Sequence, residues 1–596
     1  MTPTAAVWRF TDMKRILTLS LLFLISAAVH AQQTSTATYV HLTSRRWHTF
    51  DPANAFDVVS HIVTGNVYES LLAFKSVSQT DAFKPFLASR VPSIENGLIS
   101  KDHLRYSLPI RRNVRFHDGS LLTAEDVRYS FLRFMLLDSD GGPAALLLRP
   151  LLGVSSTRNA SGKRLISFQD AARAVTVKGG QVVFTLKKPD SSFLKLLASL
   201  PIVTSMAWAA AQKDWDGSEN AWISFNARPA DQTGLHAKMN GTGPFRLERV
   251  EDDELVLARH DGYWRSPSAL ERVRFKAVPN GGLRLFMLQA GDADSSYLED
   301  SFRPYAKAAK GLRVIDGRPD TDLGEMVFFN FKAAAAGNEM LGSGRLDGAG
   351  IPPDFFSDID VRRGFAWAFD YEQFARAAYG SLARRVRGPF PSSMAPGADG
   401  APYAKDLQKA RDAFQNAFGG EVWKKGFVLP VSYSSSNLTR ELAAEALRSG
   451  LREVNPRFRV ELHPLQSQEY YAELESRKLP LFIGGYYSDF PDPHSYAFGL
   501  LQSQSYFPKY QSFFDPEIDV LIEKAAAEAD PAARRALYQG LSVLAEKTLP
   551  HLYTYAAPPL RVCGDWVSGY DSADNTNNLH ANNFPYFYSY SKRPRP

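Results

Sequence analysis

Segments with strand patterns and segments with helix patterns are mixed throughout residues 32–596, without an internal repeat. Residues 175–178 and 182–186 are rich in β-branched residues and flank Gly179-Gly180, which predicts two strands around a glycine turn. Apolar and polar residues alternate over 273–277 and 458–462, which predicts two further strands. Strands and helices mixed without regular alternation indicate an α/β protein with several lobes.

Three helix starts are marked by polar residues that can cap free backbone N–H groups. The segment Thr123-Ala-Glu-Asp126 resembles a capping box. Asp358 and Asp360 precede an apolar stripe at helical spacing, and Asp530-Pro531 is typical of a cap followed by proline at the first helical position. We interpret the apolar stripes that follow as core packing rather than as chemistry.

Length, charge and cysteine content exclude several classes of protein. At about 150 residues per domain, 596 residues suggest roughly three or four domain-sized units. The single cysteine, Cys563, cannot form an intramolecular disulfide or a multi-cysteine zinc site, and we expect it to be a small core residue. The chain has 69 basic and 63 acidic residues, and its net charge of +6 is too small to indicate a nucleic-acid partner.

The N-terminal residues 1–31 have the pattern of a secretory signal peptide. Lys14 and Arg15 precede an apolar run over 16–25, and small residues lead up to Ala31, after which we expect cleavage. The alternative is a membrane anchor, but a bilayer span needs about 20 apolar residues and this run is much shorter. No cysteine lies at the end of the signal peptide, so we expect an exported, periplasmic protein without a lipid anchor.

Motifs for catalysis or cofactor binding are weak. The chain has no GxxxxGK[ST] phosphate loop and no HExxH zinc helix. Its twelve histidines include no pair at a spacing of three or four, so histidine clusters for a metal are not expected. Gly342-Ser-Gly344 is a poor match to a dinucleotide loop, and we interpret it as an ordinary loop. We therefore predict no cofactor and no metal.

Asp489 and Asp492 lie in the segment 484–493, which follows an apolar run at 479–483. The glycines of this segment allow close backbone approach, and its prolines end the probable strand. Strand ends of this kind often carry ligand groups in α/β folds. The two aspartates could equally bond their own backbone in a turn, and the residues alone leave both interpretations open.

Six segments of the chain, in the same order, resemble the family 5 extracellular solute-binding proteins, the dipeptide- and oligopeptide-binding components of ABC importers. They are Asp51-Pro52 with Val67-Tyr-Glu-Ser-Leu71, Arg112-Asn-Val-Arg-Phe-His-Asp-Gly119 with Leu122-Thr-Ala-Glu-Asp-Val127, Gly241-Thr-Gly-Pro-Phe245, Gly262-Tyr-Trp264, Asp360-Val-Arg-Arg363 through Ala368-Phe-Asp370, and Ser488-Asp-Phe-Pro-Asp-Pro493.

The resemblance implies a type II periplasmic binding protein-like fold, in which two lobes enclose a ligand and lobe I carries an extra subdomain. Such a protein captures a solute by closing and delivers it to a membrane permease, without making or breaking a bond. We expect it to act as a monomer. The implied division is lobe I at 32–65, 190–310 and 549–596, the extra subdomain at 66–189, and lobe II at 311–548.

The resemblance also implies ligand-binding residues. Asp489 matches the family's aspartate for the α-ammonium group of a peptide, and Tyr486 stands where the family usually has tryptophan. The other candidates are aromatic or charged residues near the expected cleft, and we interpret Arg115, Asp118 and Thr123 as fold determinants instead. These further candidates are Tyr487, Tyr470, Arg477, Trp47, His48 and Phe50.

A peptide or peptide-like solute is the leading hypothesis for the cargo. The change from tryptophan to Tyr486 keeps open a non-peptide cargo such as an oligosaccharide, an opine or a metal chelate. Two other classes of function are an exported hydrolase acting through acidic residues and a chaperone that binds unfolded segments in an aromatic cleft.

Overall fold

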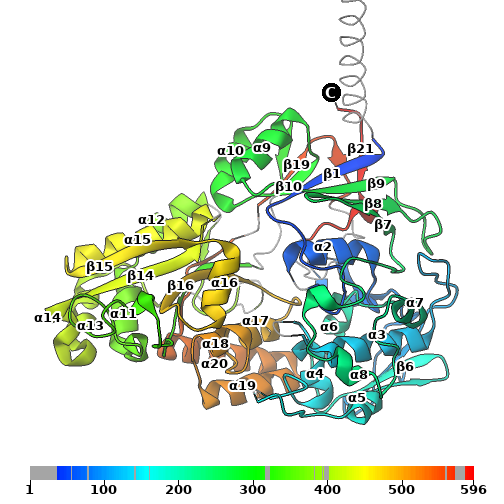
Figure 1. Ribbon diagram of the computed structural model, residues 1–596, viewed down its shortest axis with the longest axis horizontal. Coiled ribbons are helices and arrows are strands. Elements are labelled where there is room, and N and C mark those ends of the chain that lie inside the picture. The colour runs from blue at the N-terminus through cyan, green and yellow to red at the C-terminus, as the bar shows by residue number, and fades with distance from the viewer. Residues whose placement is uncertain are drawn as a thin grey trace, which may run out of the picture.

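The computed structural model describes residues 36–595 in two sheet-centred halves, which Figure 1 shows side by side. None of the described helices is long and apolar enough to cross a membrane. The expected signal peptide, 1–31, lies outside the described residues. Within 36–595 the description omits residues 56, 77–78, 140–141, 160, 316–321, 381–382, 392–393, 395–401, 436, 558–559 and 571–583.

The first half is built on a seven-stranded mixed sheet. Its first strand, β1, runs parallel to both of its neighbours, β9 and β10, and the edge strands pair antiparallel. Helices α2 (Val58–Val67), α9 (Gly281–Ala290) and α10 (Arg303–Ala308) pack around this sheet. In spatial order the strands are β11 (Leu312–Val314), β19 (Arg561–Gly564), β10 (Ser295–Tyr297), β1 (Thr38–Thr43), β9 (Arg272–Ala277), β8 (Glu254–Arg259) and β7 (Phe245–Val250).

The second half has its own seven-stranded sheet, in which β12 pairs antiparallel with β16, and β14 lies parallel to β15 and β16. Its strands are β13 (Arg384–Arg385), β18 (Tyr555–Ala557), β12 (Asp322–Phe329), β16 (Leu481–Tyr487), β14 (Phe427–Ser434) and β15 (Phe458–Leu465), with β17 (His551–Leu552) also on β12. Its helices are α11 (Ile359–Ala368), α12 (Tyr371–Ala378), α13 (Leu407–Asn416), α14 (Glu421–Lys425), α15 (Leu438–Val454), α16 (Ser467–Glu475), α17 (Pro493–Leu501), α18 (Tyr506–Tyr510), α19 (Pro516–Ala527) and α20 (Pro531–Thr548).

Both ends of the second sheet differ from the boundaries expected for lobe II, which were residues 311 and 548. Residues 312–314 form β11, which pairs with β19 in the first sheet. The strands β17 and β18 pair with β12 in the second sheet, which therefore extends to residue 557. The sequence pattern did not mark these short segments as strands, because their pairing partners lie far away in the chain.

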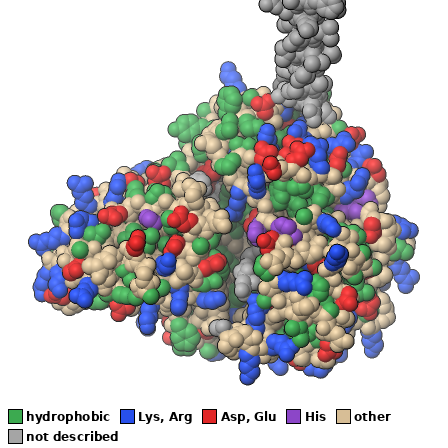
Figure 2. All heavy atoms as spheres, viewed as in Figure 1, with side chains coloured by type: hydrophobic (Ala, Val, Ile, Leu, Met, Phe, Trp, Pro, Cys, Tyr) green, Lys and Arg blue, Asp and Glu red, His purple; other side chains and the backbone are tan. Residues whose placement is uncertain are grey.

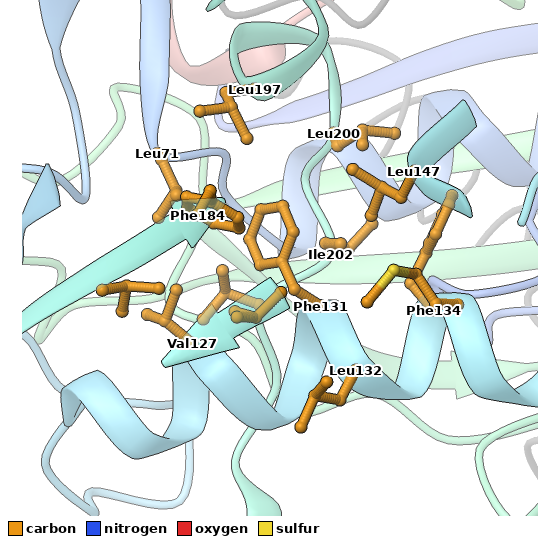
Figure 3. Close-up of a cluster of buried hydrophobic side chains, with 14 of the residues drawn as sticks. Leu71, Val127, Phe131, Leu132, Phe134, Leu147, Phe184, Leu197, Leu200 and Ile202 are labelled. Carbon is orange, nitrogen blue, oxygen red and sulfur yellow. The ribbon is translucent and has the colours of Figure 1, made fainter. Parts of the chain in front are cut away.

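The extra subdomain has one hydrophobic core, part of which Figure 3 shows. Phe131 from α3 (Ala124–Leu137) contacts Phe184 from β6, with ring centroids 4.8 Å apart. The same core includes Leu197, Leu200 and residues as far as Leu235, so the packing unit continues beyond the expected end at 189. Its other elements are β2 (Leu72–Ser76), β3 (Gln79–Pro85), β4 (Arg105–Pro109), α4 (Ala145–Leu152), α5 (Phe168–Ala174), β5 (Val175–Lys178), β6 (Gln181–Thr185), α6 (Phe193–Ser199), α7 (Met206–Ala211) and α8 (Trp222–Phe225).

The structure confirms the locally marked elements. Thr123 and Asp126 form the expected capping box, in which the Asp126 N–H donates to Thr123 Oγ1 and the Thr123 N–H donates to the Asp126 carboxylate. Asp358 caps α11 and Asp530 caps α20. The expected strands at 175–178 and 182–186 are the antiparallel pair β5 and β6. Cys563 is buried, as expected of a core residue.

Three of the family-like segments meet at one buried carboxylate, that of Glu69. It accepts hydrogen bonds from Thr242 Oγ1 at 2.7 Å, from the Tyr263 hydroxyl at 2.6 Å and from Trp264 Nε1 at 2.9 Å. Burial raises the pKa of Glu69 to about 7, although these three donors lower it. The glycine at 241 is required here, because a Cβ atom would lie 2.0 Å from the carbonyl oxygen of Val67.

Arg133 joins two buried aspartates in the first half. Its guanidinium donates to Asp51 at 2.5 and 2.7 Å and to Asp214 at 2.9 and 3.0 Å. The three side chains are at most 1% exposed. Because two carboxylates share one buried cation, removal of that cation would leave both charges without compensation.

We predict that Arg133→Met lowers the free energy of unfolding by about 3–5 kcal/mol, because it leaves buried carboxylates unpaired. Urea unfolding followed by circular dichroism measures this change. Arg173→Met is the matched control, since Arg173 pairs with Asp170 on the surface and is 72% exposed. The control should change stability by less than about 1 kcal/mol. Equal effects of the two variants would contradict the assigned role of Arg133.

Candidate ligand cleft between the lobes

An ion-pair network connects the two halves through Asp492, which follows β16. Lys195, on α6 of the first half, donates to the Asp492 carboxylate at 3.0 Å. Arg534, on α20 of the second half, donates to both oxygens of the same carboxylate at 2.6 and 3.0 Å. Burial alone would raise the pKa of Asp492, but the two cations hold it well below its usual value. Asp492 is therefore an ionised, structural carboxylate.

The halves also touch at other places. On one side, the Ser191 N–H donates to the Ala526 carbonyl oxygen at 2.9 Å, and Lys188 pairs with Glu523 at 2.7 Å. Elsewhere, the hydroxyls of Tyr297 on β10 and Tyr487 on β16 lie 3.0 Å apart. Figure 2 shows the cleft that runs between the halves. The molecule is therefore in a conformation in which the lobes are in contact.

Asp489 lies in this seam, three residues before Asp492. Its backbone N–H donates to Ser495 Oγ at 2.7 Å, and the Tyr486 hydroxyl donates to its carboxylate at 3.3 Å. The next residue, Phe490, is packed in the core of the extra subdomain. Asp489 thus lines a small pocket, of about 20 Å³, together with residues of the first half such as His61.

The Asp489 carboxylate has no cationic partner among the described residues. Burial raises its pKa to about 7, although the hydrogen bonds from Tyr486 and Ser495 lower it. A partly buried carboxylate in contact with a pocket can be stabilised by a cation that enters the pocket. The arrangement therefore suits a positively charged group of a ligand.

Tyr486 supports the loop that carries Asp489. Its ring lies against Tyr496, at 5.6 Å between centroids, and its hydroxyl donates to the Ser495 carbonyl oxygen at 2.9 Å. A Cβ atom at residue 499 would lie 2.2 Å from that hydroxyl, so Gly499 makes room for the tyrosine. The neighbouring side chain of Tyr487 is 41% exposed.

The loop after β1 carries the candidates from the first half. Trp47 stacks on Phe50 with ring centroids 5.9 Å apart. Phe50 is 2% exposed and belongs to the core of the first half, whereas His48 is exposed. Pro52, two residues after Phe50, lines the same pocket as Asp489. The loop thus leads into the seam, but Phe50 itself packs in the core.

Tyr470 and Arg477 do not lie with Asp489. Tyr470 is 2% exposed, and its hydroxyl donates to the carbonyl oxygen of Ile483 in the middle of β16. Arg477 is exposed and precedes β16, whereas Asp489 follows it. Seven residues at about 3.3 Å each separate the two ends of this strand by about 20 Å. The spacing in the sequence did not indicate this separation.

Sequence reasoning missed interface residues, among them Lys195, Arg534 and Tyr297. Lys195 and Asp492 are 297 positions apart in the chain. No local motif marks either the lysine or Arg534, and only the partner Asp492 lay in a segment with a pattern. Contacts of this kind depend on how the lobes pack, which a single sequence does not show.

The comparisons with known proteins identify the family of the chain. Residues 82–507 match the bacterial extracellular solute-binding proteins, family 5. Heme-binding protein A of Haemophilus influenzae is 25% identical over 572 residues, which cover 92% of this chain and 93% of the relative. Dipeptide-binding protein DppE of Bacillus subtilis is 22% identical, with 87% of each chain covered.

A solved structure shows the same fold. The periplasmic binding protein DppA of Helicobacter pylori, in complex with the peptide STSA, superposes with a TM-score of 0.73 at 19% identity. The match covers 95% of this chain and 99% of DppA, so the type II periplasmic binding protein fold is confirmed. The chain belongs to the family 5 bacterial extracellular solute-binding proteins, which serve ABC importers as binding components and are not enzymes.

Proposed function

We propose that this protein captures a peptide or peptide-like solute between its lobes, with Asp489 receiving the α-ammonium group. The observation that carries this proposal is the Asp489 carboxylate, which faces an interlobe pocket without a cationic partner among the described residues. An ammonium group would form a charge-assisted hydrogen bond with it, and enclosure by the lobes would strengthen the pair.

A binding site between the two lobes explains why solute binding and closure of the lobes are coupled. A solute held by Asp489 from the second lobe and by the loop at 47–52 from the first makes its full set of contacts only when the lobes meet. Such a ligand shifts the population towards the closed form. Trp47, His48 and Tyr487 are the other side chains that we propose as walls of the site. Phe50, Tyr470 and Arg477 have no direct part in it.

The proposed setting follows from the family and from the N-terminus. We propose that residues 1–31 are removed on export and that the mature protein works in the periplasm as a monomer without a lipid anchor. It would hand its solute to the permease of an ABC importer in the inner membrane. The relatives named for a dipeptide and solved with a peptide support a peptide as cargo.

A non-peptide cargo is the second candidate. The relative with 25% identity is named for heme, and the resemblance places Tyr486 where the family usually has tryptophan. Native mass spectrometry of protein purified from its own host separates the two candidates. A co-purifying peptide supports the first, whereas a co-purifying tetrapyrrole, sugar or chelate without peptide supports the second.

We predict that Asp489→Ala weakens the binding of a free peptide by about 2–5 kcal/mol, because it removes one member of an enclosed charge pair. Calorimetry with di-, tri- and pentaalanine gives the affinities, and the tightest of these is used for the comparison. The N-acetylated form of that peptide lacks the ammonium and should bind weakly to both proteins.

Asp252→Asn is the matched control, because it removes one negative charge from an exposed position in the turn before β8. Its affinity for the free peptide should equal that of the unaltered protein. If Asp489→Ala also leaves the affinity unchanged, the ammonium does not bind at Asp489.

The affinity for a free peptide should depend on pH in a bell shape. Below pH 7 the Asp489 carboxyl, with its pKa of about 7, is protonated and must lose this proton before it pairs with an ammonium. The affinity should therefore rise by up to about tenfold per unit from pH 5 to 7. Above about pH 8 it should fall again, because the α-amino group of the peptide loses its proton.

Calorimetry at several pH values, in buffers with different ionisation enthalpies, measures both the affinity and the proton release. Asp489→Asn should remove the rise between pH 5 and 7 and leave only the fall above pH 8. A rise that persists unchanged in this variant would assign the titration to another group, such as Glu69.

A further inference from the structure

A second pocket, of about 240 Å³, lies where the extra subdomain meets the second lobe. Helix α4 and residues 187–192 line it from the first half, and α17 and α19 line it from the second. Figure 1 shows these elements together in the lower part of the molecule. Ser495 lines this pocket and also accepts the hydrogen bond from the Asp489 N–H, and Leu146 lines both pockets, so the two are neighbours that share Leu146.

The floor of this second pocket is apolar. Aliphatic and aromatic side chains come from both halves, and three of them, Leu196, Phe490 and Ile522, are at most 4% exposed. A floor of this kind favours an apolar group of a ligand. The side chains are Leu146, Leu152, Leu196, Phe490, Phe498 and Ile522.

Arg149 is a cation of the pocket that has acidic groups near it but no direct ion-pair partner among the described residues. The Arg149 guanidinium lies 4.4 Å from the centroid of the Phe498 ring and donates to Ser155 Oγ at 3.3 Å. It is half-buried and forms no ion pair with any residue in the described part of the chain. Burial lowers the pKa of Arg149, although the nearby carboxylates of Glu523, Asp519 and Asp190 raise it.

The other charged groups of the pocket have partners or, like Lys187, are exposed at its edge. Lys188 pairs with Glu523 at 2.7 Å, and both side chains are more than half exposed. The Asp190 carboxylate accepts hydrogen bonds from the N–H and the hydroxyl of Ser192, at 2.8 and 2.6 Å. Burial lowers the pKa of His494 from its usual value, which disfavours a positive charge on its ring. Arg149 is thus the group best placed to receive an anion.

We propose that this pocket is a second binding site, separate from the Asp489 site, for a small molecule with a short apolar chain and a carboxylate. The planar guanidinium can bind a carboxylate with two parallel hydrogen bonds, and the apolar floor can take the chain. At about 30 Å³ for each water-sized volume, the pocket holds about eight non-hydrogen atoms. Hexanoate has this size.

Occupation of the site is coupled to closure of the lobes. Arg149 and Leu146 belong to the first half, whereas Phe498 and Ile522 belong to the second, so the complete pocket exists only while the halves are in contact. A carboxylate bound there therefore stabilises the closed form by its differential affinity for that form.

Ligand-observed NMR titrations with hexanoate and with hexanamide test this site. Hexanamide has nearly the same shape but no charge, so the comparison on the unaltered protein needs no variant. We expect saturable binding of hexanoate, and hexanamide should bind at least about tenfold more weakly. Binding of the two compounds with equal affinity, or no saturable binding of hexanoate, would overturn the proposal.

Three variants locate the binding. Arg149→Met should weaken hexanoate at least about tenfold, and Arg149→Lys, which keeps the charge but loses the paired donors, should have an intermediate effect. Arg173→Met, at an exposed arginine of the same half, should bind hexanoate as the unaltered protein does. Unchanged binding in Arg149→Met would contradict the assignment.

Asp489→Asn separates this site from the proposed peptide site. Hexanoate should bind this variant with the same affinity as the unaltered protein, even if the proposed role of Asp489 in peptide capture is wrong. A loss of hexanoate binding in Asp489→Asn would place the carboxylate in the peptide cleft and would overturn the proposal of a separate site.

Discussion

The interaction on which the seam depends is the pairing of Asp492 with Lys195 and Arg534. A buried carboxylate with two cations is strongly favoured over one that has lost them, because an unpaired charge in this environment costs several kcal/mol. Asp492 also caps α17 by accepting from the His494 N–H at 2.8 Å. One side chain therefore fixes the end of the loop 488–493, the start of the next helix and the approach of the first lobe.

This constraint gives two aspartates of one segment opposite properties. Asp492 has two cations beside it, and its pKa is held well below the usual value. Asp489 is three residues away, has only neutral donors, and its pKa is raised by burial to about 7. The first carboxylate is used by the fold, and the second is left for a ligand. Environment rather than residue type separates structural from binding roles here.

The predictions from sequence succeeded where the signal is local. The caps at Thr123, Asp358 and Asp530 depend on residues within one turn, and the structure confirms them. The segment with Asp489 could be found because glycines and prolines mark the end of a strand. The sequence could not show where Tyr470 and Arg477 lie relative to Asp489. The direction in which a side chain points and the position at which a strand ends both depend on tertiary packing. The lobe boundaries moved for the same reason, since pairing partners of short strands are distant in the chain.

A binding protein must also open, and the buried charges around Asp492 are arranged so that opening leaves none of them unpaired. When the lobes separate, the bond between Lys195 and Asp492 breaks. Asp492 then keeps its two hydrogen bonds from Arg534 in its own lobe, and Lys195 keeps Asp81, at 2.6 Å, in the first lobe. The large penalty for an uncompensated buried charge is avoided on both sides. The ion pair between Lys195 and Asp492 can therefore align the lobes while contributing little to the stability of a ligand-free closed state. The equilibrium between open and closed forms then depends mainly on the solute.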